Sequence, residues 1–570
     1  MEKRWRFKNN DIDAGRVCAL QSCANLSYET AAILASRGIT PENYGDFIHE
    51  SIHNLLDPFL LCDMQKATDR IKKAIQNNEH ITVYGDYDVD GISATVLLLK
   101  YFKSRNIDCD YYIPDREAEG YGINKDALVA IKERGTSLLI TVDTGITACE
   151  EVEFAKQYGI DIIVTDHHEP KDEIPKAVAV VDPKRKECEY PFKELSGTGV
   201  AFKLICALEG DARQLVIDYG DIVAVATVAD VVSLTGENRI LTALGIRKLR
   251  KMPAVAYEAI MKGIGIKKEE ISSYHIGFAI APRINAAGRM GTAEKAVELL
   301  LTEDMDDAKR RAQELDDINT QRKETGQNIL SEAIEEIESG RLYENKVIVL
   351  AHKNWHHGII GITASRLAEM YERSIILISL DHEDGKGSGR AAAGLNLFDA
   401  LTSVSHLLLK FGGHAAAAGL TISKENIDLL RTELNSFAEE HVCEENMIPI
   451  VDIDIELSCR KPLLQLAEEM LVLEPFGSGN EKPVFALMNA EVTSVRTDRS
   501  ERHLMMKVKK DNTYVDCVGF GMGGLRSGIN VGDRIDIAAT LNKNVYGNSV
   551  TAQLHIADIK EAQCNTHMKN

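Results

Sequence analysis

The stretch HITVYGDYDVDGISAT, residues 80–95, decides both the fold and the chemistry that this chain can support. Its β-branched and aromatic run, ITVY, is typical of a buried strand. Three aspartates follow on alternate positions, Asp86, Asp88 and Asp90. In an extended backbone, alternate residues point to one face, so neighbouring carboxylates of this set would lie about 7 Å apart. At an effective dielectric of about 20, each such pair of carboxylates would repel by roughly 2 kcal/mol. We therefore expect a cation at the end of this strand.

Length and composition exclude several classes of protein. A chain of 570 residues is too long for one core, and 44% hydrophobic with 27% charged residues is ordinary globular composition. The eleven cysteines are scattered, which argues against a disulfide framework and against zinc fingers. The sequence has no apolar run long enough to span a bilayer and no signal-peptide core, so we expect a cytoplasmic protein that does not associate with a membrane. The net charge of −21 argues against a nucleic-acid binder, although a local basic groove would still allow one.

The predicted fold class is α/β, with two lobes and a β-rich domain after them. Residues 1–75 have helical patterns, and from 76 to 302 apolar runs alternate with helical segments, which indicates a parallel sheet buried on both faces. The charge-rich, proline-free segment 303–340 predicts one connecting helix on the order of 55 Å long. A second α/β domain with a parallel-sheet core is expected over 341–447. Short strands within 448–565 fit a small barrel, for which the oligonucleotide-binding (OB) fold is one candidate.

Further acids and imidazoles stand where other apolar runs end. Asp143 ends LLITVDTG, and Asp166, His167 and His168 end IIVTDHH. Asp230 follows the apolar stretch IVAVATVA. Because ligands of parallel sheets gather at the carboxyl ends of the strands, we expect these side chains to converge with the three aspartates. Carboxylates with imidazole favour Mn²⁺ or Mg²⁺, and so many acids could hold two ions about 3.5–4 Å apart, ready for in-line attack on a phosphate.

Two other interpretations of the aspartates are weaker. DYDVDGISATVL begins like a calcium-binding EF-hand loop, but Leu97 stands where the bidentate glutamate is needed, and a strand precedes the loop. Aspartates after strands also cap helices, which explains one aspartate but not three. A site for Mn²⁺ or Mg²⁺ is therefore the favoured interpretation.

The motifs DYDVDG, VDTG and TDHH, in that order, resemble those of the DHH phosphoesterase superfamily. The resemblance implies a DHH domain, a linking helix, a DHHA1 domain and an OB barrel. It is most specific for the branch of that superfamily that digests single-stranded DNA. The segments that carry this closer resemblance are 112–122, 195–204, 282–291, 387–397, 411–419 and 473–485.

The resemblance also implies an activity. It is Mn²⁺- or Mg²⁺-dependent 5′→3′ hydrolysis of single-stranded DNA to mononucleotides, in recombination and repair, beside a single-stranded-DNA-binding protein and a helicase. We expect Asp143 to bridge the two ions and His168 to contact the scissile phosphate, and we count Asp166 with them as catalytic. Many small phosphatases of the superfamily carry a histidine where this chain has Tyr84, so one metal position is expected to have one ligand fewer. The implied metal ligands are Asp86, Asp88, Asp90, Asp143, His167 and Asp230.

Two small-residue segments are candidates for binding DNA. In PRINAAGRMG, Arg283, Asn285 and Arg289 stand among residues that would let a phosphate backbone approach closely. In GSGRAAAG, a backbone nest and a guanidinium fork could hold a phosphate through Ser388 and Arg390. The alternatives are a surface salt-bridge network for the first segment and a plain turn for the second.

Two further residues complete the expected binding site. The resemblance implies that Arg116 forms the pocket for the 5′-terminal phosphate together with the serine and arginine of GSGRAAAG. His414 of GGHAAAAG is a candidate contact to the same strand, and equally a packed structural residue.

Two other functions remain open at this point. One is a phosphodiesterase of short oligonucleotides or cyclic dinucleotides, as in shorter DHH–DHHA1 proteins, although the barrel and the chain length speak against it. The other is a scaffold without activity. Scaffolds of this superfamily have lost metal ligands, whereas this chain keeps each acid and the DHH histidine.

Overall fold

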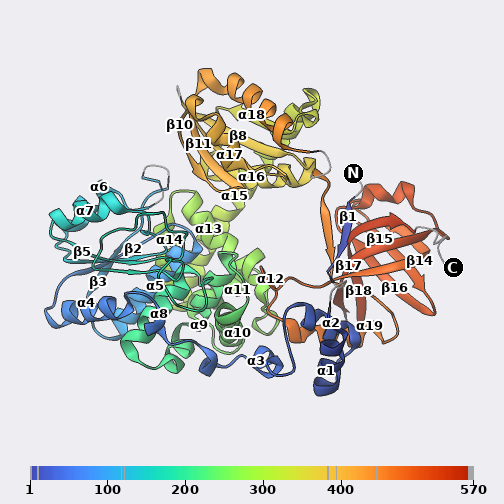
Figure 1. The fold of residues 1–570 in the computed structure, drawn as a ribbon, viewed down its shortest axis with the longest axis horizontal. Helices are drawn as coiled ribbons and strands as arrows, with labels where there is room; N and C mark the ends of the chain where they lie inside the picture. Colours follow the sequence, from blue (N-terminus) through green and yellow to red (C-terminus); the bar gives the residue numbers. More distant parts are fainter. Residues whose placement is uncertain are drawn as a thin grey trace. The chain divides into compact units, whose positions relative to one another are not determined.

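The chain forms two compact units in this computed structural model (Figure 1). One unit comprises Met1–His49, Glu444–Glu474 and Glu481–Asn570, and the other comprises Glu50–Cys443 and Pro475–Asn480. Within the described residues, no helix is long and apolar enough to cross a membrane. The described residues are 3–8, 12–116, 119–120, 122–381, 384–392, 394–443, 447–547 and 549–562.

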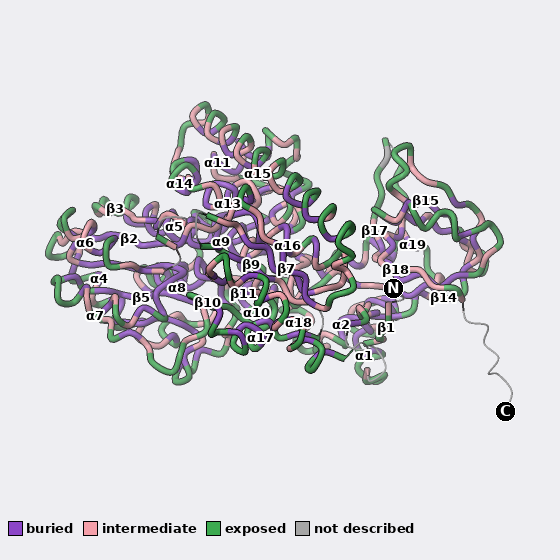
Figure 2. Tube along the Cα trace, turned by 90° about the horizontal axis from the view of Figure 1, so that it is seen from above, coloured by how far each residue is buried: buried purple, intermediate pink, exposed green. Residues whose placement is uncertain are grey.

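The larger unit begins with a five-stranded parallel sheet. Its strand order is β3-β2-β4-β5-β6, and every neighbouring pair is parallel, which confirms the sheet predicted from the apolar runs. β2 is buried along its whole length because helices cover both faces of the sheet (Figure 2). The strands are β2 (Ile81–Gly85), β3 (Cys109–Tyr112), β4 (Leu138–Val142), β5 (Asp161–Thr165) and β6 (Ala179–Val181).

Helices pack on both sides of this sheet. One face of β2 packs against α5 and α8, through Ile81 and Val83, and the other face, through Tyr84, packs against α6 and α7. The helices are α4 (Met64–Gln76), α5 (Val89–Ser104), α6 (Lys125–Glu133), α7 (Cys149–Gln157) and α8 (Gly197–Glu209).

A helical region follows the sheet and supplies further site residues. The apolar stretch that ends at Asp230 is the helix α9 rather than a strand. Ser273 begins a helical stretch that runs from α12 through a π-helical turn, η4, into α13. The elements are α9 (Ala212–Ala229), α10 (Gly236–Lys251), α11 (Val255–Gly263), α12 (Ser273–His275), η4 (Ile276–Ile280), α13 (Ala281–Arg289) and α14 (Ala293–Leu301).

The charge-rich segment forms a single helix, α15 (Met305–Ser339), as predicted, and leads into the second domain. The sheet of that domain has the order β10-β11-β9-β8-β7, and only β7 and β8 are parallel. Our expectation of a parallel core therefore holds here for one pair of strands. Only two residues separate β8 from β9, and so short a connection permits only antiparallel pairing.

The elements of this domain are β7 (Val347–His352), α16 (His357–Tyr371), β8 (Ser374–Asp381), β9 (Asp384–Arg390), α17 (Leu397–Ser403), β10 (Leu408–Gly413), β11 (Ala417–Ser423) and α18 (Ile427–His441).

The smaller unit contains the predicted barrel. Its strand order is β13-β14-β15-β16-β18-β17, and β14 also pairs with β17, which closes the sheet on itself. The strands are β13 (Ile455–Glu456), β14 (Val484–Thr497), β15 (Leu504–Lys510), β16 (Thr513–Gly519), β17 (Arg534–Tyr546) and β18 (Ser549–Glu561).

The N-terminal segment is divided between the two units. Residues up to His49 belong with the barrel and those from Glu50 onward with the sheet domain. It also begins with a strand, β1 (Arg4–Phe7), which pairs in parallel with β12 (Ile450–Ile453). A four-residue strand whose partner lies more than 400 residues away has no local sequence signal, so only helices were expected here. The main helices of this unit are α1 (Ala14–Ala24), α2 (Tyr28–Ser36), α3 (Tyr44–Ile48) and α19 (Leu463–Glu469).

We predict that Gly245→Ala destabilises the larger unit. A Cβ at Gly245 of α10 would lie 2.1 Å from the carbonyl oxygen of Gly220 and 2.4 Å from the Cβ of Ala224, both on α9. Forcing these helices apart should cost about 1–3 kcal/mol, measured as a lower urea midpoint by circular dichroism. Gly263→Ala, where an added Cβ meets nothing within 4 Å, is the matched control. Equal midpoints for the two variants would contradict this packing argument.

Candidate metal centre

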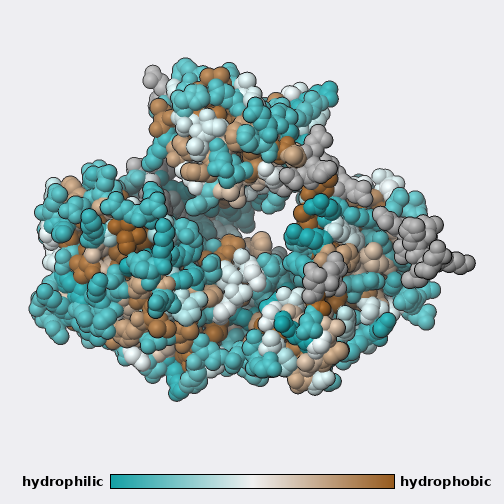
Figure 3. Space-filling view, viewed as in Figure 1, coloured by the Kyte–Doolittle hydropathy of each residue, from teal (hydrophilic) through white to brown (hydrophobic). Residues whose placement is uncertain are grey.

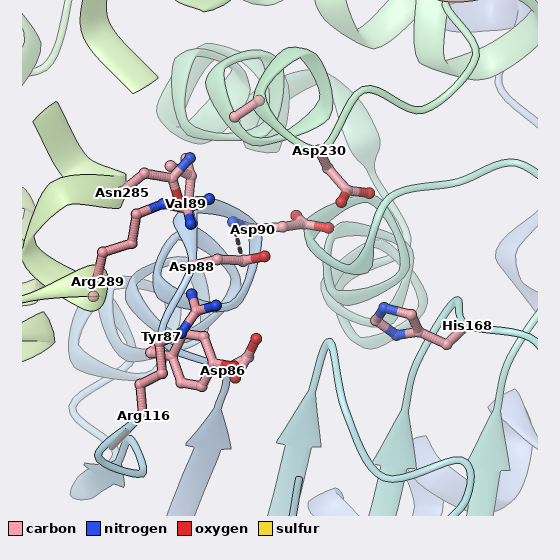
Figure 4. A pocket seen from close by; sticks show the side chains of 12 residues that line it. Asp86, Tyr87, Asp88, Val89, Asp90, Arg116, His168, Asp230, Asn285 and Arg289 are labelled. Carbon is pink, nitrogen blue, oxygen red and sulfur yellow. Dashed lines mark hydrogen bonds between the residues drawn. The ribbon is translucent and has the colours of Figure 1, made fainter. Parts of the chain in front are cut away.

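The three aspartates stand on a strand-to-helix turn, not on an extended strand. β2 ends at Gly85, and Asp88 is already the N-cap of α5, accepting hydrogen bonds from the backbone N–H groups of Asp90 (2.9 Å) and Gly91 (3.1 Å). The backbone of Asp88 is still extended, but Asp90 lies in the first turn of α5, so the expectation of one extended face is wrong for Asp90. The turn nevertheless brings the carboxylates of Asp86, Asp88 and Asp90 toward one space (Figure 4).

Asp90 is held by the start of a second helix. Its two carboxylate oxygens accept hydrogen bonds from the backbone N–H groups of Gly197 (2.6 Å) and Thr198 (2.8 Å), in the first turn of α8. Burial raises the pKa of Asp90 to about 6 despite the bonds from Thr198, and the charge of Asp88 acts in the same direction as burial. The helix N-terminus thus compensates only part of the cost of burying this carboxylate.

Asp143, His167 and Asp230 approach one another at the same edge of the sheet. The Nε2 atom of His167 lies 3.0 Å from Oδ1 of Asp143 and 3.6 Å from Oδ2 of Asp230. Burial, together with the neighbouring His168, lowers the pKa of His167 to about 3, so its imidazole is neutral at physiological pH. A neutral imidazole is the form that binds metals.

The buried carboxylates strongly resist ionising together. Burial and the neighbouring acids raise the pKa of Asp86 and Asp143, and they raise the pKa of Asp230 to about 9. A divalent cation would relieve both the burial cost and the repulsion.

The donor atoms fit such a cation. Among the described residues, buried atoms of this cluster lack any hydrogen-bond partner: Asp86 Oδ1, Asp143 Oδ1, Asp230 Oδ2 and both ring nitrogens of His167. The ligand atoms form groups within 4.8 Å of one another: Asp86–Asp88–Asp143, Asp90–His167–Asp230 and Asp143–His167–His168. Asp143 and His167 each belong to two of these groups, and the bridging role expected for Asp143 stays a prediction. Carboxylate oxygens with one imidazole suit Mn²⁺ or Mg²⁺.

His168 has the opposite environment to its neighbour. Its Nδ1 lies 2.7 Å from Oδ1 of the buried Asp166, whose carboxylate also accepts hydrogen bonds from the backbone N–H groups of His167 (2.7 Å) and Ile146 (2.9 Å). Burial works against a charged imidazole, but the hydrogen bond and charge of Asp166 raise the pKa of His168 to about 9. His168 is therefore an imidazolium at neutral pH, and it lines the pocket (Figure 4).

Basic and amide side chains line the other side of the same pocket, a cavity of about 350 Å³. The guanidinium of Arg116 lies 5.0 Å from the ring centre of Tyr87. Asn285 accepts a hydrogen bond from the backbone N–H of Val89 (3.2 Å), which ties α13 to the start of α5. Arg289 lines the same wall (Figure 4). The pocket thus has an acidic side and a basic side.

The basic side continues into a cluster of arginines. Burial and the charges of Arg116, Arg322 and Arg390 lower the pKa of Arg289 to about 10. Arg390 donates to the hydroxyls of Ser365 (3.1 Å) and Ser388 (3.2 Å). In the described part of the chain, no salt bridge joins these four arginines to a carboxylate. Unpaired, partly buried guanidinium groups favour binding of an anion.

Arg322 was missed in the sequence. It stands on α15, in a segment rich in both charges, and nothing in that pattern distinguishes it from its neighbours. Its place is fixed by Asn319, whose buried amide oxygen accepts two of its N–H groups, at 3.2 and 2.9 Å.

Some expected residues lie elsewhere. Arg283 donates to the carbonyl of Ala279 and pairs with Asp316 (2.7 Å), in a separate cavity beside α11 and α15. His414 follows β10 and is not among the residues that line the pocket. Tyr84 points away from the site, since its hydroxyl donates to the carbonyl of Gly122 (2.9 Å).

Known proteins are similar to nearly the whole length of this chain. The DHH family N-terminal domain matches residues 80–227, the DHHA1 domain matches 344–440, and the RecJ OB domain matches 453–558. The single-stranded-DNA-specific exonuclease RecJ of Bacillus subtilis (strain 168) is 40% identical over 559 residues, which cover 97% of this chain and 70% of the relative. The protein of the same name from Escherichia coli (strain K12) is 32% identical, covering 98% of this chain and 100% of the relative. The chain belongs to the RecJ family.

Solved RecJ structures agree with the fold. A crystal structure of RecJ from Thermus thermophilus in complex with Mn²⁺ has a TM-score of 0.84 at 27% identity and covers 98% of this chain and 80% of that one. A crystal structure of exonuclease RecJ bound to manganese has a TM-score of 0.59 at 33% identity, over 66% of this chain and 95% of that one. The predicted α/β architecture with a C-terminal OB barrel is confirmed.

We predict that Asp230→Asn stabilises the metal-free protein at pH 8. The pKa of Asp230 is about 9 in the folded chain and 3.8 ordinarily, so between these values the folded chain holds a proton that the unfolded chain has released. Stability therefore falls as the pH rises through that window. The variant cannot ionise and should exceed the wild type by at least about 1 kcal/mol in EDTA, in urea unfolding.

The difference should shrink toward pH 4, and Mn²⁺ should stabilise the wild type more than the variant. A variant less stable than the wild type at pH 8 in EDTA would show that this carboxylate is not strained by burial and repulsion.

Proposed function

We propose that this chain is a metal-dependent exonuclease that hydrolyses single-stranded DNA from the 5′ end to mononucleotides. The observation that carries the proposal is one pocket lined by the carboxylates of the metal centre and by His168 on one side, and by the arginines Arg116 and Arg289, which form no salt bridge in the described chain, on the other. Relatives named single-stranded-DNA-specific exonucleases, similar over nearly the whole chain, support the substrate class.

The acidic side would hold the cofactor, one or two Mn²⁺ or Mg²⁺ ions. When bound, such ions supply an activated water and stabilise the charge that develops on a phosphate. The protein's part is to fix the geometry from rigid elements, namely the ends of β2, β4 and β5, the start of α5 and the end of α9, with the start of α8 holding Asp90. The proposed ligands are Asp86, Asp88, Asp90, Asp143, His167 and Asp230.

His168 would act on the scissile phosphate directly. As an imidazolium held by Asp166, it can donate a hydrogen bond to a phosphate oxygen and a proton to the leaving 3′-oxygen. Asp166 keeps the ring oriented and favours its charged form.

The arginine cluster would set the direction of digestion. Arg116, Arg289 and Arg390, with the hydroxyl of Ser388, would hold the 5′-terminal phosphate while the next phosphate reaches the acidic side. Hydrolysis with the 3′-oxygen as leaving group releases a 5′-mononucleotide and leaves a new 5′-phosphate on the shortened strand. The same pocket can then bind that end, so digestion continues in one direction.

The barrel would bind the strand beyond the catalytic site. Tyr514 and Phe520 are 60% and 59% exposed, and the ammonium group of Lys509 lies 5.8 Å from the ring centre of Tyr514. Exposed aromatic rings beside basic side chains suit stacking of unpaired bases. We also propose a cytoplasmic role in recombination and repair, where a helicase and a single-stranded-DNA-binding protein would supply unpaired strands.

The proposal predicts how a 5′-phosphorylated, 3′-labelled oligonucleotide is digested. With Mn²⁺ the single strand should shorten to small labelled products, whereas EDTA should prevent digestion and the blunt duplex should survive. Asp143→Ala should lower the rate more than about 100-fold with DNA binding retained, since outer-shell partners alone are typically worth 10–100-fold. If dinucleotides were cleaved and the long strand spared, the enzyme would instead be a phosphodiesterase of small substrates.

A second prediction concerns the 5′-phosphate. Arg390→Ala and Arg322→Ala should each reduce the preference for a 5′-phosphate over a 5′-hydroxyl by roughly 10- to 100-fold, the value of a charged hydrogen bond of about 1.5–3 kcal/mol. The readout is the ratio of kcat/KM for the two ends. Arg310→Ala, an exposed arginine of the same helix α15 that pairs with Asp307 and Glu314, is the control. An unchanged ratio in the first two variants would place the terminal phosphate elsewhere.

A further inference from the structure

The short segment Pro475–Asn480, which we call the clasp, supplies no ligand to the metal site and no strand to the barrel. It is the centre of the motif LEPFGSGNEKPVF, one of those that carry the family resemblance. The clasp belongs to the compact unit of the catalytic domain, whereas the chain on either side of it, Glu444–Glu474 and Glu481–Asn570, belongs to the unit with the barrel.

The clasp is a closed turn. Gly477 and Asn480 exchange backbone hydrogen bonds, each of 3.1 Å, and the buried amide of Asn480 donates to the carbonyl of Pro475 (2.9 Å). A turn whose polar groups form hydrogen bonds within the turn keeps its conformation, so it can hold the segments that pack against it in place.

One side of the clasp holds the loop that follows Asp230. The carbonyl of Ser478 accepts a hydrogen bond from the backbone N–H of Leu234 (2.7 Å). A Cβ at Gly477 would lie 2.5 Å from Cδ1 of Leu234, and one at Gly479 would lie 2.3 Å from Oγ of Ser233. A larger residue at either position would therefore require the side chain of Leu234 or Ser233 to shift.

The other side of the clasp holds the start of a helical stretch. The carbonyl of Phe476 accepts a hydrogen bond from the hydroxyl of Ser273 (2.6 Å), the first residue of α12. This stretch continues through η4 into α13, which carries Asn285 and Arg289 into the pocket. The clasp thus contacts the chain leading to both sides of the pocket.

The turn after Asp230 needs such support. Val231 has a φ of 60°, a left-handed conformation that a β-branched residue avoids, and its side chain is 69% exposed. Strained turns persist only where the surrounding structure holds them. Oδ2 of Asp230 has no hydrogen-bond partner in the described chain and lies 3.6 Å from Nε2 of His167, so the position of this carboxylate depends strongly on the backbone that carries it. Asn238 gives the loop its other support, donating to the carbonyl of Ser233 (3.0 Å).

We infer that the clasp is a positioning segment for the metal centre, which keeps Asp230 where a cation can bind it. The inference rests on the metal site of the proposed function. The inference adds that the clasp, which lies in the sequence between two segments of the barrel unit, contributes to metal affinity in the catalytic domain.

The test is Mn²⁺ binding to the full chain, measured by calorimetry and by the electron paramagnetic resonance of free Mn²⁺. Gly477→Ala should weaken Mn²⁺ binding by about tenfold, the lower range for outer-shell partners of a metal. Ser273→Ala, which removes one hydrogen bond and adds no clash, is the second variant and should weaken binding in the same direction. Gly263→Ala should bind as the wild type does, because an added Cβ there meets nothing within 4 Å.

The same measurement in an Asp230→Asn background separates positioning from general damage. If the clasp acts through Asp230, Gly477→Ala should cause no further loss in that background. An equal further loss, or unchanged binding in both clasp variants, would overturn the inference while leaving the metal site intact. A wild type that binds no Mn²⁺ would overturn the metal site itself, and the inference with it.

Discussion

Several carboxylates buried within a few ångströms of one another are the constraint on which this structure depends. Each of them is costly to remove from water, and each makes its neighbours harder to ionise. The fold compensates part of that cost with the backbone N–H groups of α5 and α8, which reach Asp88 and Asp90. Oδ1 of Asp86, Oδ1 of Asp143 and Oδ2 of Asp230 receive no such help within the described chain. A divalent cation would compensate the rest of the cost of burying these carboxylates, so we expect metal binding to stabilise the folded site.

The second constraint is to keep opposite charges apart inside one pocket. If the carboxylates and the arginines of the pocket formed salt bridges with each other, no arginine would be left to bind a phosphate. The pocket avoids this because its two arginines contact neutral groups: Arg116 lies over the ring of Tyr87, and Arg289 donates to the carbonyl of Gly358 (3.4 Å). The arginines next to them are held in the same way, Arg390 by Ser365 and Ser388, and Arg322 by Asn319. The surface in Figure 3 is mainly hydrophilic, and the net charge is −21. A local, uncompensated basic cluster is how such an acidic protein can still bind a polyanion.

The sequence predicted what depends on local pattern. The apolar runs ITVY, LLITVDTG and IIVTDHH correspond to β2, β4 and β5, and the charge-rich segment predicted α15 as one helix. It failed where distant parts of the chain decide the outcome. The pairing of β1 with β12 lies beyond any local signal. The second half of α9, from Tyr219 to Thr227, is buried, and its continuous apolar sequence before Asp230 therefore does not differ from that of a buried strand. Arg322 is held by the neutral side chain of Asn319, whereas Arg283 forms a salt bridge with Asp316. The spacing of residues in the sequence does not show which of these two arginines is left without a carboxylate partner.

The two histidines of the DHH motif show most clearly why the motif alone does not assign chemistry. They are adjacent in sequence, and their rings lie 4.4 Å apart, yet burial lowers the pKa of His167 to about 3 whereas Asp166 raises that of His168 to about 9. Each shift supports the other, because a neutral His167 does not repel the cation beside it, and a charged His168 keeps its neighbour neutral. One ring is thereby suited to bind a metal and the other to donate a proton. The single carboxylate of Asp166, hydrogen-bonded to only one of the two rings, makes that division of roles.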